Sequence, residues 1–157
     1  MESNPPGVSG GTREISAANA RLMARLFYLG NLLAFLPGLA VAPFLSIAAP
    51  QKSMMIFMFL LMVVPPILWF GLSIMVYIVA RHHPNPRVGH HTQQAAYLFY
   101  GALGVIIPVG TFFGTDWKLW IVTGGLVALV VVPWSALALW RIRREDWQDT
   151  TYEAEHP

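Results

Sequence analysis

The most regular feature of the sequence is a set of four long apolar stretches separated by short polar ones. The stretches contain no Asp, Glu, Lys, Arg or His, and they cover residues 26–51, 53–80, 92–115 and 119–140. Each is longer than the roughly 20 residues that a helix needs to cross the hydrocarbon core of a bilayer. In lipid, a helix satisfies its backbone hydrogen bonds within one segment. The pattern therefore predicts an all-α integral membrane protein with four transmembrane helices, at about residues 24–47, 54–80, 93–114 and 117–140.

The connections between the stretches predict how the helices are arranged. The first two stretches are joined by "APQK" and the last two by "GTDW". Connections this short favour antiparallel neighbours. We therefore expect two antiparallel hairpins, linked by the longer polar segment of residues 81–96, "RHHPNPRVGHHTQQAA".

The segments outside the stretches complete the predicted organisation. Residues 1–12, "MESNPPGVSGGT", are rich in Pro, Gly and Ser, and we expect this N-terminus to be disordered because it has little to bury. Residues 13–140 would form the four-helix membrane domain, with Thr12 as a candidate N-cap for a helix that begins there. Residues 141–157 change from basic to acidic and would form a cytoplasmic tail with a loose end.

The placement of Lys and Arg predicts the orientation. The two terminal segments and the 81–96 segment carry eight arginines, whereas the other two connections carry one lysine each, Lys52 and Lys118. Lys and Arg are enriched in cytoplasmic loops near the ends of transmembrane helices. Both termini and the histidine-rich loop are therefore predicted to be cytoplasmic. The eight arginines are Arg13, Arg21, Arg25, Arg81, Arg87, Arg141, Arg143 and Arg144.

The composition agrees with a membrane protein and narrows the classes of partner. Of the 157 residues, 55% are hydrophobic and 11% are charged, whereas soluble domains have about 25% charged residues. The basic residues at the ends of the stretches are expected to meet anionic lipid head groups, so the bilayer is the expected partner and nucleic acid is not. Cysteine is absent, which removes disulfides and thiolate metal sites.

The first stretch carries a stripe of small residues, which predicts close helix packing. Small side chains let helices approach closely in lipid. The stripe has two interpretations: it packs within the monomer, or it docks another membrane protein or a second copy of the chain. Its members, each four residues apart, are Gly30, Ala34, Gly38, Ala42 and Ser46.

Polar side chains inside the stretches are few, and they bear on a transport function. Asn31 is the most polar of them, and we expect it to form a hydrogen bond between helices rather than a contact with a substrate. Every stretch also contains proline, and prolines interrupt helices in transporters. Because no ionisable residue accompanies them, a small transporter or channel component is an alternative rather than the first hypothesis.

Four of the five histidines lie in the polar segment between the second and third stretches, as the pairs His82–His83 and His90–His91. Two such pairs across a short loop could place several imidazoles around one metal ion or a haem. A metal site would also need carboxylates to orient the rings, and no Asp or Glu occurs from residue 16 to residue 115. We therefore expect no cofactor, and we interpret the histidines as residues at the membrane surface.

The same segment carries a family resemblance. Pro86 is followed by Val88-x-x-His91-x-x-Gln94-Ala95, and the preceding stretch contains Pro65-x-x-x-Trp69. This arrangement resembles Tic20-like membrane proteins, which include small bacterial relatives of the DUF4870 group. The resemblance covers residues 65–99, and it departs from the family pattern at Arg87 and Gly89. It implies four spans with cytoplasmic ends in a bacterial cytoplasmic (inner) membrane. It also marks Val88, His91, Gln94 and Ala95 as family-motif positions.

These observations favour a function without catalysis. The sequence contains no G-x-S-x-G, H-E-x-x-H or Walker A motif. We therefore expect a membrane subunit, or an assembly or translocation-associated factor, that acts by packing its helices against other membrane proteins. The alternatives are the transporter or channel component, and a metal- or haem-binding protein that uses the histidine loop.

Overall fold

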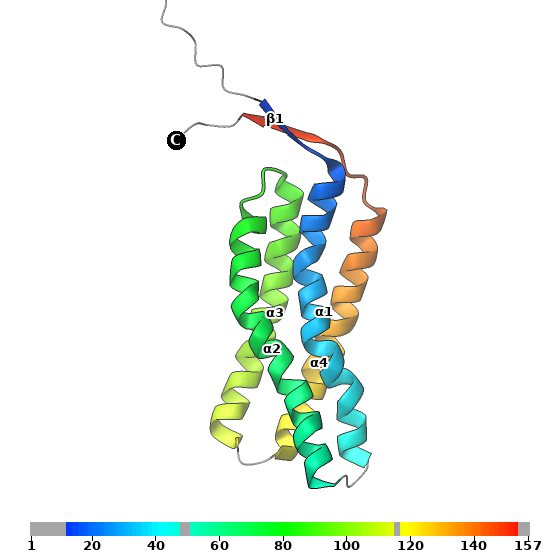
Figure 1. Cartoon of the computed structure of the whole chain (residues 1–157), viewed down its shortest axis with the longest axis vertical. Coiled ribbons are helices and arrows are strands. Elements are labelled where there is room, and N and C mark those ends of the chain that lie inside the picture. The colour runs from blue at the N-terminus through cyan, green and yellow to red at the C-terminus, as the bar shows by residue number, and fades with distance from the viewer. Residues whose placement is uncertain (1–11, 48–50, 115–116, 154–157) are drawn as a thin grey trace, which may run out of the picture.

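Four long helices make up most of the fold. The computed structural model of the chain describes residues 12–47, 51–114 and 117–153. All four helices are long and apolar enough to cross a membrane, and they lie side by side in one elongated bundle (Figure 1). The prediction of four helices of membrane-spanning length is confirmed. They are α1 (Ala17–Ile47), α2 (Lys52–Arg81), α3 (Pro86–Phe113) and α4 (Trp117–Arg144).

Helix α1 packs more extensively than any other helix in the bundle, mainly against α4 and α2 and also against α3. In its most apolar part 50% of the residues are buried, compared with 6% in α2 and 11% in α3. The start of α1, the end of α4 and the connection between α2 and α3 lie at one end of the bundle (Figure 1). We call this the sheet end, because a small β-sheet covers it.

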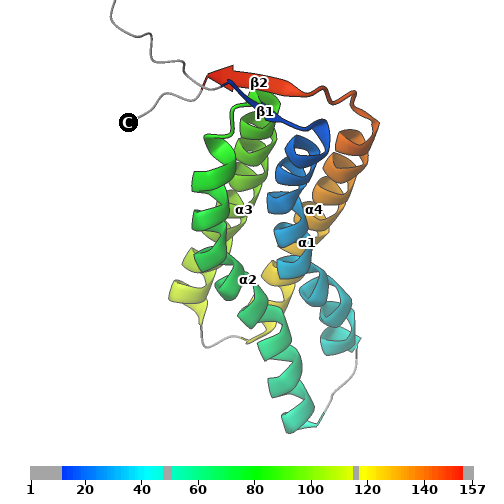
Figure 2. The same ribbon diagram turned by 45° about the horizontal axis from the view of Figure 1, so that its top comes forward.

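The sheet is a feature that the all-α prediction did not include. Strand β1 (Thr12–Ile15) pairs antiparallel with β2 (Thr150–Glu153), with Arg13 opposite Tyr152. The two strands cross the end of the bundle (Figure 2). The chain segments before α1 and after α4 emerge next to each other, so each supplies the strand partner that the other lacks. The predicted loose end of the tail is therefore wrong as far as residue 153. Residues 1–11 and 154–157, which include most of the predicted disordered N-terminus, lie outside the described residues.

The start of α1 also corrects the prediction that Thr12 is an N-cap. Thr12 lies in β1, and the capping position is Ser16, whose Oγ accepts a hydrogen bond from the N–H of Asn19 (3.3 Å). Asp149, which precedes β2, accepts a second one from the N–H of Ala17 (2.6 Å). A helix N-terminus has free N–H groups and a positive dipole end, and both favour a carboxylate. The tail therefore supplies an acid that the first turn of α1 lacks.

Helix α3 begins at Pro86 rather than near residue 93, so His90 and His91 are helical. Asn85 is its N-cap, with its Oδ1 accepting from the N–H of Arg87 (3.0 Å). Proline suits the first helical position because its missing N–H would have no partner there. The pattern of apolar residues could not locate this start, because the first two turns of α3 are polar.

Candidate functional site

Asn31 forms the main polar contact inside the bundle. Its side chain is fully buried. The Nδ2 group donates to the carbonyl of Ala95 on α3 (3.0 Å), and Oδ1 accepts from Nε1 of Trp69 on α2 (2.9 Å). Both polar atoms of the amide therefore bind neighbouring helices. The prediction that Asn31 makes a hydrogen bond between helices is confirmed.

A second polar contact joins α2 to α3. The hydroxyl of Ser73 donates to the carbonyl of Phe70 (2.8 Å) and lies 3.0 Å from the hydroxyl of Tyr100. The ring of Tyr100 packs edge-on against Phe99, with centroids 5.4 Å apart, and Phe99 packs against Phe27 of α1. Such aromatic pairs contribute about 0.5–1.5 kcal/mol each beyond the area that they bury. These contacts hold α1, α2 and α3 together near the sheet end.

The small-residue stripe of α1 faces the inside of the bundle where its side chains are described. Gly30 lies under the indole of Trp69, and a Cβ at that position would overlap the ring. Ala34 is 1% exposed. A Cβ on Gly38 would lie 3.2 Å from Cγ of Met62. These three positions therefore fit the interpretation of packing within the monomer. The side chains of the other two stripe positions, Ala42 and Ser46, lie outside the described residues.

Met62 fills a gap between two glycines on different helices. Its side chain is 7% exposed. It reaches Gly38 on α1 and also Gly124 on α4, where an added Cβ would lie 3.1 Å from the sulfur. The thioether is thus held by apolar packing, for which an unbranched methionine is well suited.

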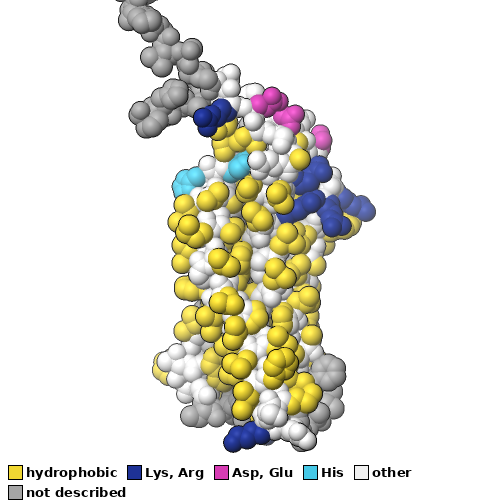
Figure 3. Space-filling view, viewed as in Figure 1, with side chains coloured by type: hydrophobic (Ala, Val, Ile, Leu, Met, Phe, Trp, Pro, Cys, Tyr) yellow, Lys and Arg dark blue, Asp and Glu magenta, His cyan; other side chains and the backbone are white. Residues whose placement is uncertain are grey.

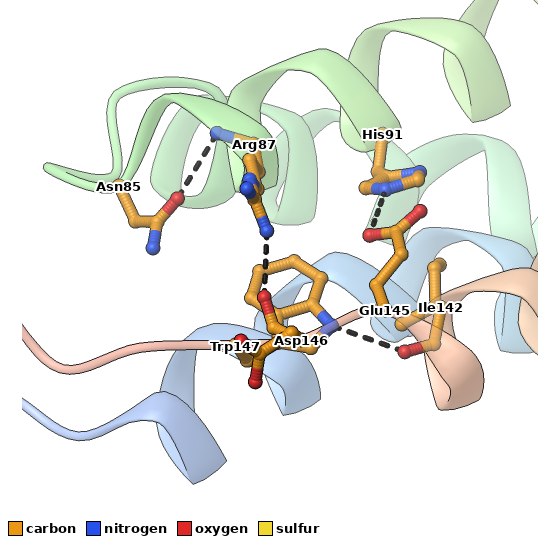
Figure 4. Close-up of polar contacts among 7 residues, drawn as sticks. All are labelled: Asn85, Arg87, His91, Ile142, Glu145, Asp146 and Trp147. Carbon is orange, nitrogen blue, oxygen red and sulfur yellow. Dashed lines mark hydrogen bonds and ion pairs between the residues drawn. The ribbon is translucent and has the colours of Figure 1, made fainter.

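The chain after α4 folds back over the start of α3 and forms a polar cluster at the sheet end (Figure 4). The Nε2–H of His91 donates to Oε2 of Glu145 (3.0 Å). One turn earlier on α3, Nη1 of Arg87 donates to the carbonyl of Asp146 (2.7 Å). His91 and Glu145 are 54 residues apart in the sequence. Sequence reasoning missed this pair, because it looked for a carboxylate only near the histidine loop.

Trp147 anchors this returning segment. Its side chain is 5% exposed, and its Nε1–H donates to the carbonyl of Ile142 in the last turn of α4 (3.0 Å). Its ring lies against His91, with centroids 6.1 Å apart. A buried indole with a satisfied N–H combines a large apolar contact with one directional bond. The segment between α4 and β2 is therefore held in a defined position.

The four candidate histidines do not share one site. The Nδ1–H of His82 donates to the carbonyl of Ile78 (2.9 Å), and Nδ1 of His83 accepts from the N–H of Asn85 (3.1 Å). Burial lowers the pKa of His83, which favours the neutral ring that this hydrogen bond requires. The rings of His90 and His91 pack edge-on, with centroids 6.0 Å apart. Within residues 12–47, 51–114 and 117–153, no three His, Cys, Asp or Glu side chains form a group that could hold a metal ion.

An open pocket of about 620 Å³ lies beside the cluster. Its lining supplies two imidazoles, two carboxylates and one guanidinium, but no hydroxyl or thiol nucleophile. The carboxylate of Glu145 orients the ring of His91 by accepting its Nε2–H. A pocket of this kind suits a polar contact better than acyl transfer, which needs a nucleophile next to a base. The six lining residues are Pro86, Arg87, His90, His91, Glu145 and Asp146.

The family-motif positions have different roles in the fold. Val88 and Ala95 are completely buried, and His91 lies on the same side of α3 because the spacing of three and four residues follows the helix period. Gln94 is exposed. Ala95 offers its carbonyl to Asn31, which also binds the Trp69 of the Pro65-x-x-x-Trp69 motif. Residues from the two halves of the resemblance thus meet at one side chain of α1.

Comparisons of the chain with protein-family models, with curated proteins and with solved structures give no match.

Proposed function

We propose that the chain is a non-catalytic subunit of a membrane complex, or an assembly or translocation-associated factor, and that it acts by packing against another membrane protein. The observation that carries this proposal is the uncovered apolar surface of α2 and α3. In the most apolar part of each helix, only 6% of the residues of α2 and 11% of those of α3 are buried. Lipid can cover such a surface, and so can a helix of another protein. The small residues on the surface of α2 and α3 favour a helix of another protein over lipid, because they let the backbone of that helix approach closely.

A groove between α3 and α4, at the border of the uncovered surface of α3, can seat such a helix. It has a volume of about 420 Å³ and is bordered by Gly101 and Val105 on α3 and by Leu126 and Val130 on α4. A Cβ added at Gly101 would meet nothing within 4 Å. The bottom of the groove is therefore open to a neighbouring side chain.

Photo-crosslinking in intact membranes tests this proposal. A photoreactive amino acid at Gly101 should give a discrete protein adduct. The same residue at Leu33, which is 74% exposed on α1, should give only lipid adducts. Adducts with lipid alone at both positions would contradict the proposal.

Loss of the partner by substitution provides an independent test. Gly101→Leu should reduce co-purification of the crosslinked protein without lowering thermal stability, since a Cβ at this position would meet nothing within 4 Å. Gly38→Leu is unsuitable for this purpose, because Gly38 contacts Met62 and its substitution would report on folding. Unchanged co-purification by the Gly101 variant would count against the groove.

We also propose that the chain belongs to the Tic20-like group and lies in a bacterial cytoplasmic membrane as two hairpins, with both termini in the cytoplasm. The orientation is supported by the arginine-rich sheet end, compared with Lys52 and Lys118 near the other end. A fluorescent protein fused to the C-terminus should fluoresce. Alkaline phosphatase inserted after Gln51, between α1 and α2, should be active only if that connection is outside the cytoplasm. The reverse pair of results would overturn the orientation.

A further inference from the structure

Three arginines from opposite ends of the sequence meet at the sheet end. Arg21 and Arg25 are four residues apart on α1, so they lie on one face of the helix. Arg143 lies in the last turn of α4, the helix that packs alongside α1. The guanidinium of Arg25 is partly buried, and Arg143 and Arg21 place like charges near it. The fold therefore concentrates positive charge between the start of α1 and the end of α4.

The described protein groups do not neutralise this charge. Nε of Arg21 and Nε of Arg25 are buried and have no hydrogen-bond partner among the described residues. None of the described carboxylates forms an ion pair with Arg21, Arg25 or Arg143. Of the nearby acids, Glu145 is bound to His91 and Asp149 caps α1. A buried donor without a partner is unfavourable, so the cluster lacks an acceptor.

The position of the cluster identifies the kind of acceptor. On the face that Figure 3 shows, most of the basic side chains gather at the sheet end, next to the hydrophobic side chains that cover the rest of this face. The guanidinium of Arg144 stacks on the ring of Trp140, 4.1 Å from its centroid, and Trp140 is 49% exposed. Tryptophan is enriched where a membrane protein passes the head groups. The cluster therefore lies at the depth where lipid phosphates are found.

We propose that Arg21, Arg25 and Arg143 together bind the phosphate of an anionic phospholipid, and that this site joins α1 to α4. Guanidinium groups suit this ligand, because their planar N–H donors match the oxygens of a phosphate in pairs. One phosphate shared by the three side chains offsets the repulsion around Arg25. It supplies acceptors for the two buried Nε groups when the side chains of Arg21 and Arg25 turn toward it. The site requires that the four helices lie in a bilayer, and it is independent of the proposed protein partner.

Lipid binding by the purified full-length protein tests the site. Native mass spectrometry would measure the retention of phosphatidylglycerol, with phosphatidylcholine as the neutral comparison. Arg21→Gln/Arg25→Gln should weaken the retention of phosphatidylglycerol by about fivefold for each arginine, as expected for a basic residue at the surface of an anionic membrane. The control is Arg13→Gln/Arg81→Gln, which removes the same charge from exposed positions at the same end of the protein and should retain the lipid like the unchanged protein.

Each of the remaining outcomes also supports or refutes the lipid site. If both double variants lose the lipid equally, general surface charge explains binding and the site is refuted. If inorganic phosphate protects the protein against heating as well as phosphatidylglycerol does, the ligand is a free anion and the lipid assignment is wrong. If Arg21→Gln/Arg25→Gln fails to fold, Arg143→Gln and Arg25→Lys replace it. Both should weaken retention, the second because lysine keeps the charge but loses the paired donors, and full retention by both would overturn the proposal.

The two proposals fail independently. Loss of lipid retention in the arginine variants with an unchanged crosslink at Gly101 would support the lipid site and leave the partner groove intact. An absent crosslink at Gly101 with selective lipid retention would remove the groove and keep the lipid site.

Discussion

The contact between Gly30 and Trp69 offers the sharpest test of how α1 packs against α2. A Cβ at position 30 would overlap the six-membered ring of Trp69, so Gly30→Ala must displace the indole. The displaced indole loses its hydrogen bond to Asn31, in which Nε1 and Oδ1 are 2.9 Å apart. Gly71, on α2 like Trp69, is the matched control, because a Cβ at position 71 would meet nothing within 4 Å.

The magnitude follows from three terms. Overpacking a well-filled interior costs about 1–3 kcal/mol, and an interhelical hydrogen bond in a membrane protein contributes about 0.6–2 kcal/mol. Alanine is better than glycine in a helix by about 1 kcal/mol, which opposes the other two terms. Gly30→Ala should therefore lower the free energy of unfolding by about 1–4 kcal/mol. Gly71→Ala should leave it unchanged or raise it by up to about 1 kcal/mol.

Unfolding by sodium dodecyl sulfate in mixed micelles, followed by circular dichroism, measures both variants on the same scale. A double-mutant cycle identifies the cause, because Trp69→Leu removes the ring that the new methyl group would strike. In that background Gly30→Ala should cost nothing or become stabilising. Equal effects of Gly30→Ala and Gly71→Ala would refute the packing argument. So would an undiminished cost of Gly30→Ala in the Trp69→Leu background.

Three further predictions concern the sheet end. Asp149→Ala removes the acceptor for the N–H of Ala17 and should lower the free energy of unfolding by about 1 kcal/mol. Asp149→Asn keeps an acceptor oxygen and should lose only a small part of that stability. Trp147→Ala should speed amide hydrogen exchange in residues 150–153, and unchanged exchange would show that the indole does not hold the strand. Because burial lowers the pKa of His83, the unfolded chain takes up a proton first as the pH falls through about 6.5. The melting temperature should therefore fall from pH 8 to pH 5, and the fall should be smaller in His83→Gln; an equal fall in both would contradict the role of His83.

The helices could be predicted from the sequence because their main cause is local. Long runs without charge report a lipid environment, and in lipid the backbone has few alternatives to a helix. The helix ends were harder to predict for the same reason. The first turns of α3 and the last turn of α4 contain polar residues, so their ends depend on caps such as Asn85 rather than on hydropathy. Strand β1 could not be predicted, because its partner β2 lies at the other end of the sequence.

The candidate site was predictable only in part. The regular spacing of Gly30, Ala34 and Gly38 indicates close packing, and all three are buried. The same spacing says nothing about which side chains fill the space above them. The axial position of α2 relative to α1 determines that these side chains are Trp69 and Met62. The pairing of His91 with Glu145 was missed for a similar reason, since it depends on the path of the chain after α4.

Asn31 links the packing of the helices to the position of the candidate site. In a bilayer, an apolar helix surface packs against lipid chains about as favourably as against another apolar helix. Apolar packing alone therefore does little to prevent one helix from sliding along another. The side chain of Asn31 makes two directional bonds, one to Trp69 on α2 and one to Ala95 on α3. A shift of α1 by one turn, about 5.4 Å, would break both and leave a buried amide without partners. We infer that Asn31 sets the axial position of α2 and α3 relative to α1. Because Ala95 and His91 are one turn apart on α3, the same bond fixes the height of His91 relative to α1.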